Sequence, residues 1–234
     1  MSARQALVTG ASSDIGRAIV GALVADGVLV TAAGRDAARL ADLPATAIVG
    51  DLMDAAYIER LAEVPADIFV AAAGHRFVYQ RFVAFDPEDA RRLQAVDVDA
   101  FAVLCKRLIP GMMGRRFGRI VAVTSLAAMV GGPGAAPYAQ AKAAVEGLVR
   151  GLATDVGRFG ITVNAVAPGF VQTSRLAARS GDATRDLAKK TAVGRLASPE
   201  DVAGPVAFLC GSAAAYVTGH TLIVDGGLHL ATAW

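Results

Sequence analysis

The stretch ALVTGASSDIGRAIVGALVADG, residues 6–27, decides the fold class. It opens with a short apolar run typical of a buried strand, turns between Gly10 and Gly16, and continues with helical periodicity to Ala25. A glycine-rich turn between a strand and a helix lets backbone N–H groups approach a phosphate, which the helix N-terminus also attracts. The stretch therefore predicts an α/β fold with an anion-binding turn after its first strand.

The rest of the chain alternates short apolar runs with longer helical patterns. We expect further strands at residues 28–33, 45–49, 67–72, 119–124, 161–166 and 221–224, and further helices at 54–63, 87–113, 139–159 and 199–210. This alternation predicts a doubly wound parallel sheet of about seven strands with helices on both faces. No linker or repeat is visible, so residues 1–234 are expected to form one Rossmann domain. Residues 170–193 are the least regular and are predicted to be a mobile lid.

Composition and charge exclude several classes of protein. Hydrophobic residues make up 54% and charged residues 19% of the chain, which fits a packed globular domain. A formal net charge of +2 offers no concentrated basic face for nucleic acid. The longest uncharged stretch, residues 120–141, contains glycines and prolines and cannot be a membrane span. The two cysteines and three histidines lack ligand-like spacing, so we expect no metal and a reducing, cytoplasmic location.

A second motif carries the chemistry. Tyr138 and Lys142 are four residues apart, so a helix would place them one turn apart on one face. Ser125 ends a predicted strand 13 residues before Tyr138. Taken alone, a tyrosine and a lysine at this spacing would usually be a surface pair.

Together with the first turn, this constellation resembles the short-chain dehydrogenase/reductase family, whose turn reads T-G-x-x-x-G-x-G. The resemblance spans residues 6–227 and implies an oxidoreductase that interconverts a ketone and a secondary alcohol. It implies that Tyr138 exchanges the proton, that Lys142 favours tyrosinate and holds the nicotinamide ribose, and that Ser125 orients the substrate oxygen. Asp97 stands where the family has a fourth catalytic member, an asparagine whose backbone carbonyl holds a relay water.

The resemblance also implies a dinucleotide site. Gly34 occupies the place of the acid that binds the ribose of NAD, and Arg35 follows it. An arginine here can pair with the 2′-phosphate of NADP(H), so the sequence predicts NADP(H) as the cofactor. A solvated surface arginine is the alternative, and Asp51 either meets the adenine or caps a helix. The implied cofactor-binding residues are Gly10, Ser12, Ser13, Asp14, Ile15, Gly16, Arg35, Asp51, Leu52, Ala73, Gly74, Tyr138, Lys142, Pro168, Gly169, Val171 and Thr173.

Besides Asp97, three positions depart from the family pattern. Asp14 replaces a glycine of the turn, where a carboxylate would repel the pyrophosphate. We expect Asp14 instead to cap the following helix with its carboxylate turned to solvent. Ala71 and Ala72 replace two asparagines that help to tie strands together, and their loss need not block the cofactor.

Within the family, the layout most resembles the 3-oxoacyl-[acyl-carrier-protein] reductases, through residues 114–119 and 194–201. This implies a β-ketoacyl thioester on an acyl carrier protein as substrate, and a homotetramer packed through the two long helices and the C-terminal segment. Arg115, Arg116 and Arg158 would form a basic docking patch beside the mouth of the site. Two alternatives stay open: a dehydrogenase of small cyclic or aromatic alcohols, and a non-catalytic dinucleotide-binding protein.

Overall fold

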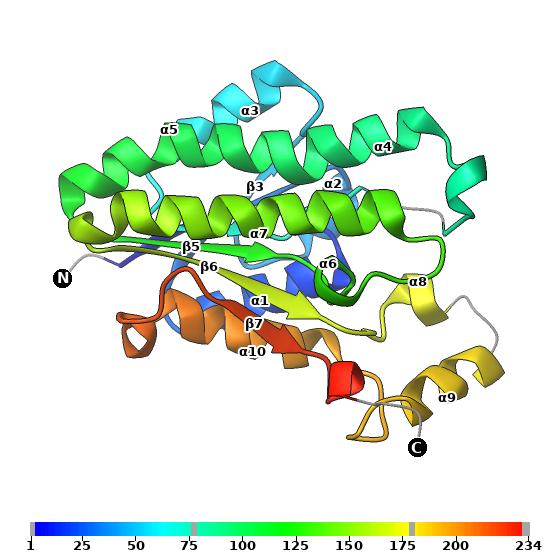
Figure 1. The fold of residues 1–234 in the computed structure, drawn as a ribbon. Helices are drawn as coiled ribbons and strands as arrows, with labels where there is room; N and C mark the ends of the chain where they lie inside the picture. The colour runs from blue at the N-terminus through cyan, green and yellow to red at the C-terminus, as the bar shows by residue number, and fades with distance from the viewer. Residues whose placement is uncertain (1–2, 76–78, 178–180, 231–234) are drawn as a thin grey trace.

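All seven strands form one parallel sheet in the order β3-β2-β1-β4-β5-β6-β7, which confirms the predicted fold class (Figure 1). The computed structural model describes residues 3–75, 79–177 and 181–230. The strands are β1 (Gln5–Thr9), β2 (Leu29–Gly34), β3 (Thr46–Val49), β4 (Ile68–Ala71), β5 (Gly118–Val123), β6 (Ile161–Pro168) and β7 (Thr221–Val224). Because all run parallel, their carboxyl ends share one edge of the sheet, where open α/β folds bind ligands.

Helices cover both faces of this sheet (Figure 1). They are α1 (Asp14–Ala25), α2 (Ala37–Ala41), α3 (Ala55–Ala62), α4 (Pro87–Leu93), α5 (Ala100–Arg115), α6 (Ala127–Val130), α7 (Ala136–Val156), α8 (Ser174–Ala177), α9 (Gly181–Lys189) and α10 (Pro199–Cys210). One core cluster joins α3, α5 and α7 to the sheet, and the other joins α1 and α10 to its opposite face. In the part of the chain that the structure describes, no helix is long and apolar enough to cross a membrane.

Two glycines bring the first turn against the neighbouring strand. Gly10 has a φ of +69°, and a Cβ there would lie 2.5 Å from the backbone of Ala72 and Ala73. A Cβ on Gly16 would lie 2.1 Å from the Gly10 carbonyl oxygen. These close approaches require glycine, so the turn between β1 and α1 is seated beside the end of β4.

The predicted helix at residues 87–113 is interrupted. A π-helical turn, Gln94–Asp99, separates α4 from α5 and buries Asp97 and Val98. Such turns hold one residue more than an α-helical turn and occur frequently at functional sites. Apolar periodicity does not reveal the extra residue, because the pattern on either side remains helical.

The segment at residues 170–193 is more regular than expected. Helices α8 and α9 occupy much of it, and residues 178–180 lie outside the described part. Its charged residues include good helix formers, which the prediction of an irregular stretch undervalued. That this segment moves as a lid stays a prediction.

Candidate active site

Tyr138 and Lys142 lie one turn apart at the start of α7, and the Lys142 Nζ atom is 5.8 Å from the centroid of the Tyr138 ring. Lys142 is buried and donates to the carbonyl oxygen of Val123, at the end of β5, over 3.2 Å. Ser125 follows two residues later, and its Oγ accepts from the Ala127 N–H at 3.2 Å. The fold thus gathers the end of β5 and the first turns of α7 around one ammonium group.

The carboxylate of Asp97 also reaches this ammonium. Its Oδ2 lies 2.9 Å from Lys142 Nζ, and its Oδ1 accepts from the backbone N–H of His75 at 2.7 Å. The side chains of both members of the pair are almost fully buried, with 0% of Asp97 and 7% of Lys142 exposed. The sequence pointed to the main chain of Asp97, whereas the structure shows a direct side-chain ion pair.

This pair fixes the charge of Lys142. Burial alone would lower the pKa of the ammonium, but the negative charge of Asp97, aided by Tyr138, outweighs burial and raises that pKa. Lys142 is therefore positively charged at neutral pH, next to the phenol ring of Tyr138.

Glu146 is a site residue that the sequence reasoning missed. It lies on α7 one turn beyond Lys142, is buried, and its Oε1 accepts from the Thr124 hydroxyl at 3.1 Å. Burial raises the pKa of Glu146, against the opposing effects of Thr124 and Arg150. Because Thr124 directly precedes Ser125, this contact helps to fix the end of β5. The four-residue spacing between Lys142 and Glu146 places both on one helix face, and this could have identified Glu146 from the sequence.

At the ends of β2 and β3, Arg35 and Asp51 face each other across 3.6 Å, and both are exposed. A Cβ on Gly34 would lie 2.8 Å from the Ser12 hydroxyl, so an acidic side chain there would require Ser12 to move. Asp51 accepts from the Met53 N–H at 3.0 Å in a local turn, whereas Asp54 is the N-cap of α3. The exposed guanidinium of Arg35 can pair with an anionic group of a dinucleotide bound at this edge.

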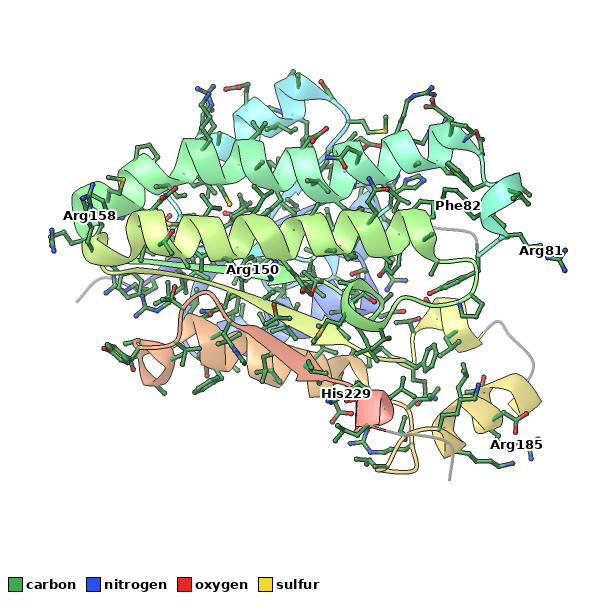
Figure 2. The ribbon with its side chains drawn as sticks, in the orientation of Figure 1. Arg81, Phe82, Arg150, Arg158, Arg185 and His229 are labelled. Atoms are coloured by element: carbon green, nitrogen blue, oxygen red, sulfur yellow. The ribbon has the colours of Figure 1, made fainter. Side chains whose placement is uncertain are left out.

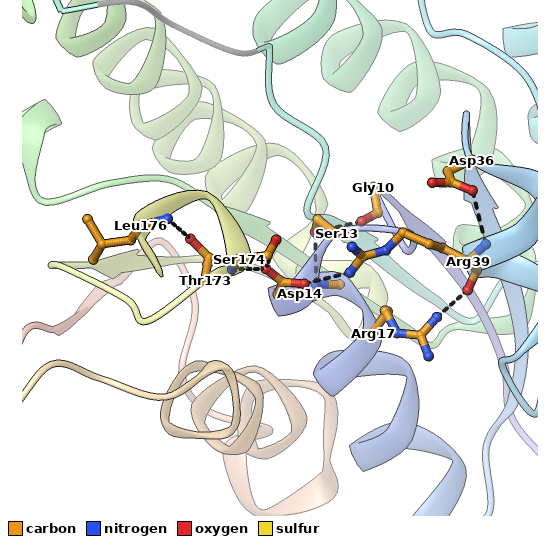
Figure 3. Close-up of polar contacts among 10 residues, drawn as sticks. Gly10, Ser13, Asp14, Arg17, Asp36, Arg39, Thr173, Ser174 and Leu176 are labelled. Atoms are coloured by element: carbon orange, nitrogen blue, oxygen red, sulfur yellow. Dashed lines mark hydrogen bonds and ion pairs between the residues drawn. The ribbon is translucent and has the colours of Figure 1, made fainter. Parts of the chain in front are cut away.

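The expectation for Asp14 was wrong. Ser13 is the N-cap of α1, since its hydroxyl oxygen accepts from the Gly16 N–H at 3.0 Å. The Asp14 carboxylate turns to Arg39, at 2.5 Å, and to Ser174 rather than to solvent (Figure 3). Both partners come from elements that border the first turn, α2 and α8, and their positions cannot be read from local sequence.

The predicted docking patch was also misplaced. Arg115 pairs with Asp67 at 2.8 Å, and Arg116 donates to the carbonyl oxygen of Arg158 at 3.2 Å. All three arginines lie at the amino ends of the strands, with Arg158 at the far end of α7 (Figure 2). Ser125 lies beyond the opposite end of the six-residue strand β5, a length of roughly 20 Å. These arginines therefore do not border the site.

The remaining predicted residues lie at the same edge as the candidate site. Leu52 and Ala73 line a small cavity with Asp97 and Lys142. A Cβ on Gly74 would lie 3.5 Å from Lys142 Nζ. Pro168 ends β6, and Gly169, Val171 and Thr173 follow it toward α8. Among the described residues, no group of histidine, cysteine and acidic side chains could hold a metal ion.

A family model described as enoyl-(acyl carrier protein) reductase matches residues 10–229. The chain belongs to the short-chain dehydrogenase/reductase family. It is 36% identical to the 3-oxoacyl-[acyl-carrier-protein] reductase FabG of Escherichia coli, over 96% of this chain and 97% of that protein. The chain is therefore an NAD(P)-dependent oxidoreductase that acts on CH–OH groups.

Solved structures of two other family members resemble this chain. A 3-oxoacyl (acyl-carrier-protein) reductase from Agrobacterium tumefaciens with NADP bound has a TM-score of 0.89 and 29% identity, covering 95% of this chain and 93% of that one. A putative gluconate 5-dehydrogenase from Beutenbergia cavernae, also with NADP, has a TM-score of 0.90 and 36% identity, covering 98% of both chains. The family member described here is thus similar to enzymes with two different kinds of substrate.

Proposed function

We propose that this short-chain dehydrogenase/reductase uses NADPH to reduce a β-ketoacyl thioester, carried on an acyl carrier protein, to the secondary alcohol. The observation that carries the proposal is the buried, positively charged Lys142 beside Tyr138, with Ser125 at the end of the adjoining strand. Three groups suited to stabilising and protonating a developing alkoxide stand at one edge of the sheet. A protein that only bound the dinucleotide would have no chemical need for all three.

Each residue has a defined task in the proposed reaction. NADPH, when bound, supplies the hydride that forms the new C–H bond at the carbonyl carbon. Tyr138 donates its phenolic proton to the carbonyl oxygen, which completes the alcohol, and Ser125 orients that oxygen. The Lys142 ammonium stabilises the phenolate left behind. Asp97 and the Val123 carbonyl hold the ammonium in place.

Exposed apolar side chains near this edge favour an acyl chain over a polyol. Phe82 and Val83, in the loop after β4, are 63% and 93% exposed, and Met129 of α6 is 54% exposed. The loop after β4 meets the loop that leads into α7 through a hydrogen bond from the Gln80 N–H to the Gly134 carbonyl, 3.3 Å. An acyl chain would cover this apolar rim, whereas a sugar acid would not.

The proposal is tested by following NADPH absorbance with a panel of ketones. We expect the highest kcat/KM with β-ketoacyl thioesters, ahead of keto sugar acids and of cyclic and aryl ketones. Preference for a keto acid would support a gluconate-type activity, and preference for a cyclic or aryl ketone would support a small-alcohol dehydrogenase. NADPH binding without turnover of any ketone would support the non-catalytic alternative.

Cofactor choice is expected to depend on Arg35. Arg35 directly follows Gly34, which occupies the place of the acid in an NAD enzyme, and 66% of the Arg35 side chain is exposed to an incoming phosphate. We expect Arg35→Ala to lower kcat/KM for NADPH by about tenfold or more, and to leave that for NADH within about twofold. Steady-state kinetics with both cofactors decide this. Equal use of the two cofactors by the wild type would contradict the assignment.

Docking of an acidic carrier protein at the site needs a cation at the carboxyl edge of the sheet. Arg81 is exposed there, in the loop after β4, while Arg158 lies at the opposite end (Figure 2). We expect Arg81→Glu to raise KM for a carrier-bound substrate several-fold at low salt, with little change for a small thioester. Arg116→Glu, at the far end, is the matched control. Equal effects of the two substitutions, or none, would argue against a carrier protein.

We also propose that the chain assembles as a homotetramer. A shallow groove between α5 and α7 is lined mostly by small and apolar residues: Val98, Asp99, Ala102, Ala144, Gly147, Leu148, Gly151, Leu152 and Asp155. The two helices lie side by side on one face of the molecule (Figure 1). Small residues allow helices of a second copy to approach closely, which supports packing through this face.

A further inference from the structure

Asp14 links two segments that are 160 residues apart in the sequence. It is the first residue of α1, in the turn proposed to hold the pyrophosphate. Its Oδ2 accepts two hydrogen bonds from Ser174, one from the backbone N–H at 2.7 Å and one from the hydroxyl at 2.8 Å (Figure 3). Ser174 directly follows Thr173, one of the cofactor-binding residues that the family resemblance implies.

The other carboxylate oxygen of Asp14 is neutralised by Arg39. The two groups are 2.5 Å apart, and Arg39 is itself held because the Asp36 side chain accepts from its backbone N–H at 3.0 Å. Arg17 donates to the carbonyl oxygen of Arg39, so a second guanidinium borders the cluster. Burial tends to raise the pKa of Asp14, but the hydrogen bonds from Ser174 and the charge of Arg39 outweigh it and lower that pKa. The carboxylate is therefore ionised and engaged on both oxygens at neutral pH.

The segment that Asp14 holds has a second anchor at its base. Val171 forms a β-bridge with Ala197, and the Gln172 N–H donates to the Ala197 carbonyl oxygen at 2.7 Å. The chain between this bridge and Asp14 is therefore attached at both ends. If Asp14 were replaced, the segment would keep only the bridge between Val171 and Ala197.

We infer that Asp14 is a positioning residue that fastens the segment carrying Thr173 and Ser174 to the phosphate-binding turn, so that the two walls of the cofactor site are joined before NADPH binds. This inference rests on the proposed dinucleotide site. A glycine at this position, as in the family pattern, could not make the link. The expected consequence is slower release of the cofactor, because the segment must detach from Asp14 before the site opens.

Hydrogen exchange in the cofactor-free protein tests the link directly. We expect Asp14→Gly to speed exchange of the backbone amides at residues 173–177 by about tenfold or more, because it removes both hydrogen bonds from Ser174 to an ionised group. Ser174→Ala should speed exchange less, because it removes only the bond from the hydroxyl and keeps the one from the backbone N–H. The double variant should exchange no faster than Asp14→Gly alone, because that substitution already removes every bond that Ser174→Ala removes. Asp36→Ala is the control, since Asp36 contacts Arg39 but not Ser174.

Stopped-flow measurement of NADPH dissociation tests the consequence. Asp14→Gly should release NADPH about tenfold faster, Ser174→Ala at a rate between those of Asp14→Gly and the wild type, and Asp36→Ala at the wild-type rate. Unchanged exchange in Asp14→Gly, or additive effects in the double variant, would overturn the link. Tighter NADPH binding by Asp14→Gly would show that the carboxylate is simply a misplaced charge. If the wild type bound no NADPH, the proposed function and the effect on release would both fail, while exchange would still report on the link.

Discussion

Replacing Tyr138 by phenylalanine is expected to lower kcat for ketone reduction by about 10²- to 10⁴-fold, the usual contribution of general acid catalysis. The phenyl ring can keep its place in the first turn of α7, near the Lys142 ammonium, but it has no proton to donate. The fold and the affinity for NADPH should stay close to those of the wild type. Steady-state kinetics and calorimetric titration of NADPH measure the two quantities separately.

Tyr57→Phe provides the matched control. The Tyr57 hydroxyl donates to the Ile48 carbonyl oxygen of β3 at 2.9 Å, beside the proposed adenosine end of the cofactor and not beside Lys142, so its loss should reduce stability slightly and leave kcat unchanged. If Tyr138→Phe kept a large part of the turnover, another group would be the proton donor. A loss of NADPH binding in the same variant would show that the Tyr138 hydroxyl is needed to hold the cofactor.

The sequence predicts the fold well because its signals are local. Each buried strand of a parallel sheet is a short apolar run, and β7 and α10 begin and end at the predicted residues. The turn at Gly10 and the spacing from Tyr138 to Lys142 are also local, so they could be placed on a strand end and a helix face. The position of the docking arginines could have been corrected as well. In a parallel sheet, a turn that leads into a strand lies at the amino edge, away from the site.

The contacts that the sequence could not give are the long-range ones between charged groups. Asp14 has Arg39 and Ser174 as partners, and Asp97 has Lys142, yet nothing in the spacing of these residues marks them as pairs. The chain contains many cations that could pair with a given carboxylate, and the sequence does not show which of them the fold brings close to it. The partner is decided by which helices and loops the fold brings together at the carboxyl edge of the sheet.

Asp97→Ala is expected to reduce the free energy of unfolding by about 3–5 kcal/mol at neutral pH, because it leaves the Lys142 ammonium buried without a counter-ion. It also removes the acceptor of the His75 N–H. Urea unfolding followed by circular dichroism gives the value. Gln94→Ala is the control in the same π-helical turn, because Gln94 is exposed and its side chain contacts only Asp99 among the hydrogen bonds described, so its change should stay within about 0.5 kcal/mol.

The pH dependence separates an unpaired charge from a simple cavity. In the wild type, the pKa of Lys142 is raised above the ordinary 10.5, so the ion pair stabilises the fold at neutral pH and is lost only as pH rises through that raised value. In Asp97→Ala, burial acts alone and lowers the pKa of Lys142, so the folded protein releases this proton more readily than the unfolded chain. The stability deficit should therefore shrink between about pH 7 and pH 9.5. Asp97→Asn, which can still accept from His75, should show the same trend. A deficit that did not change with pH would trace the loss to packing and the His75 contact, and not to the charge of Lys142.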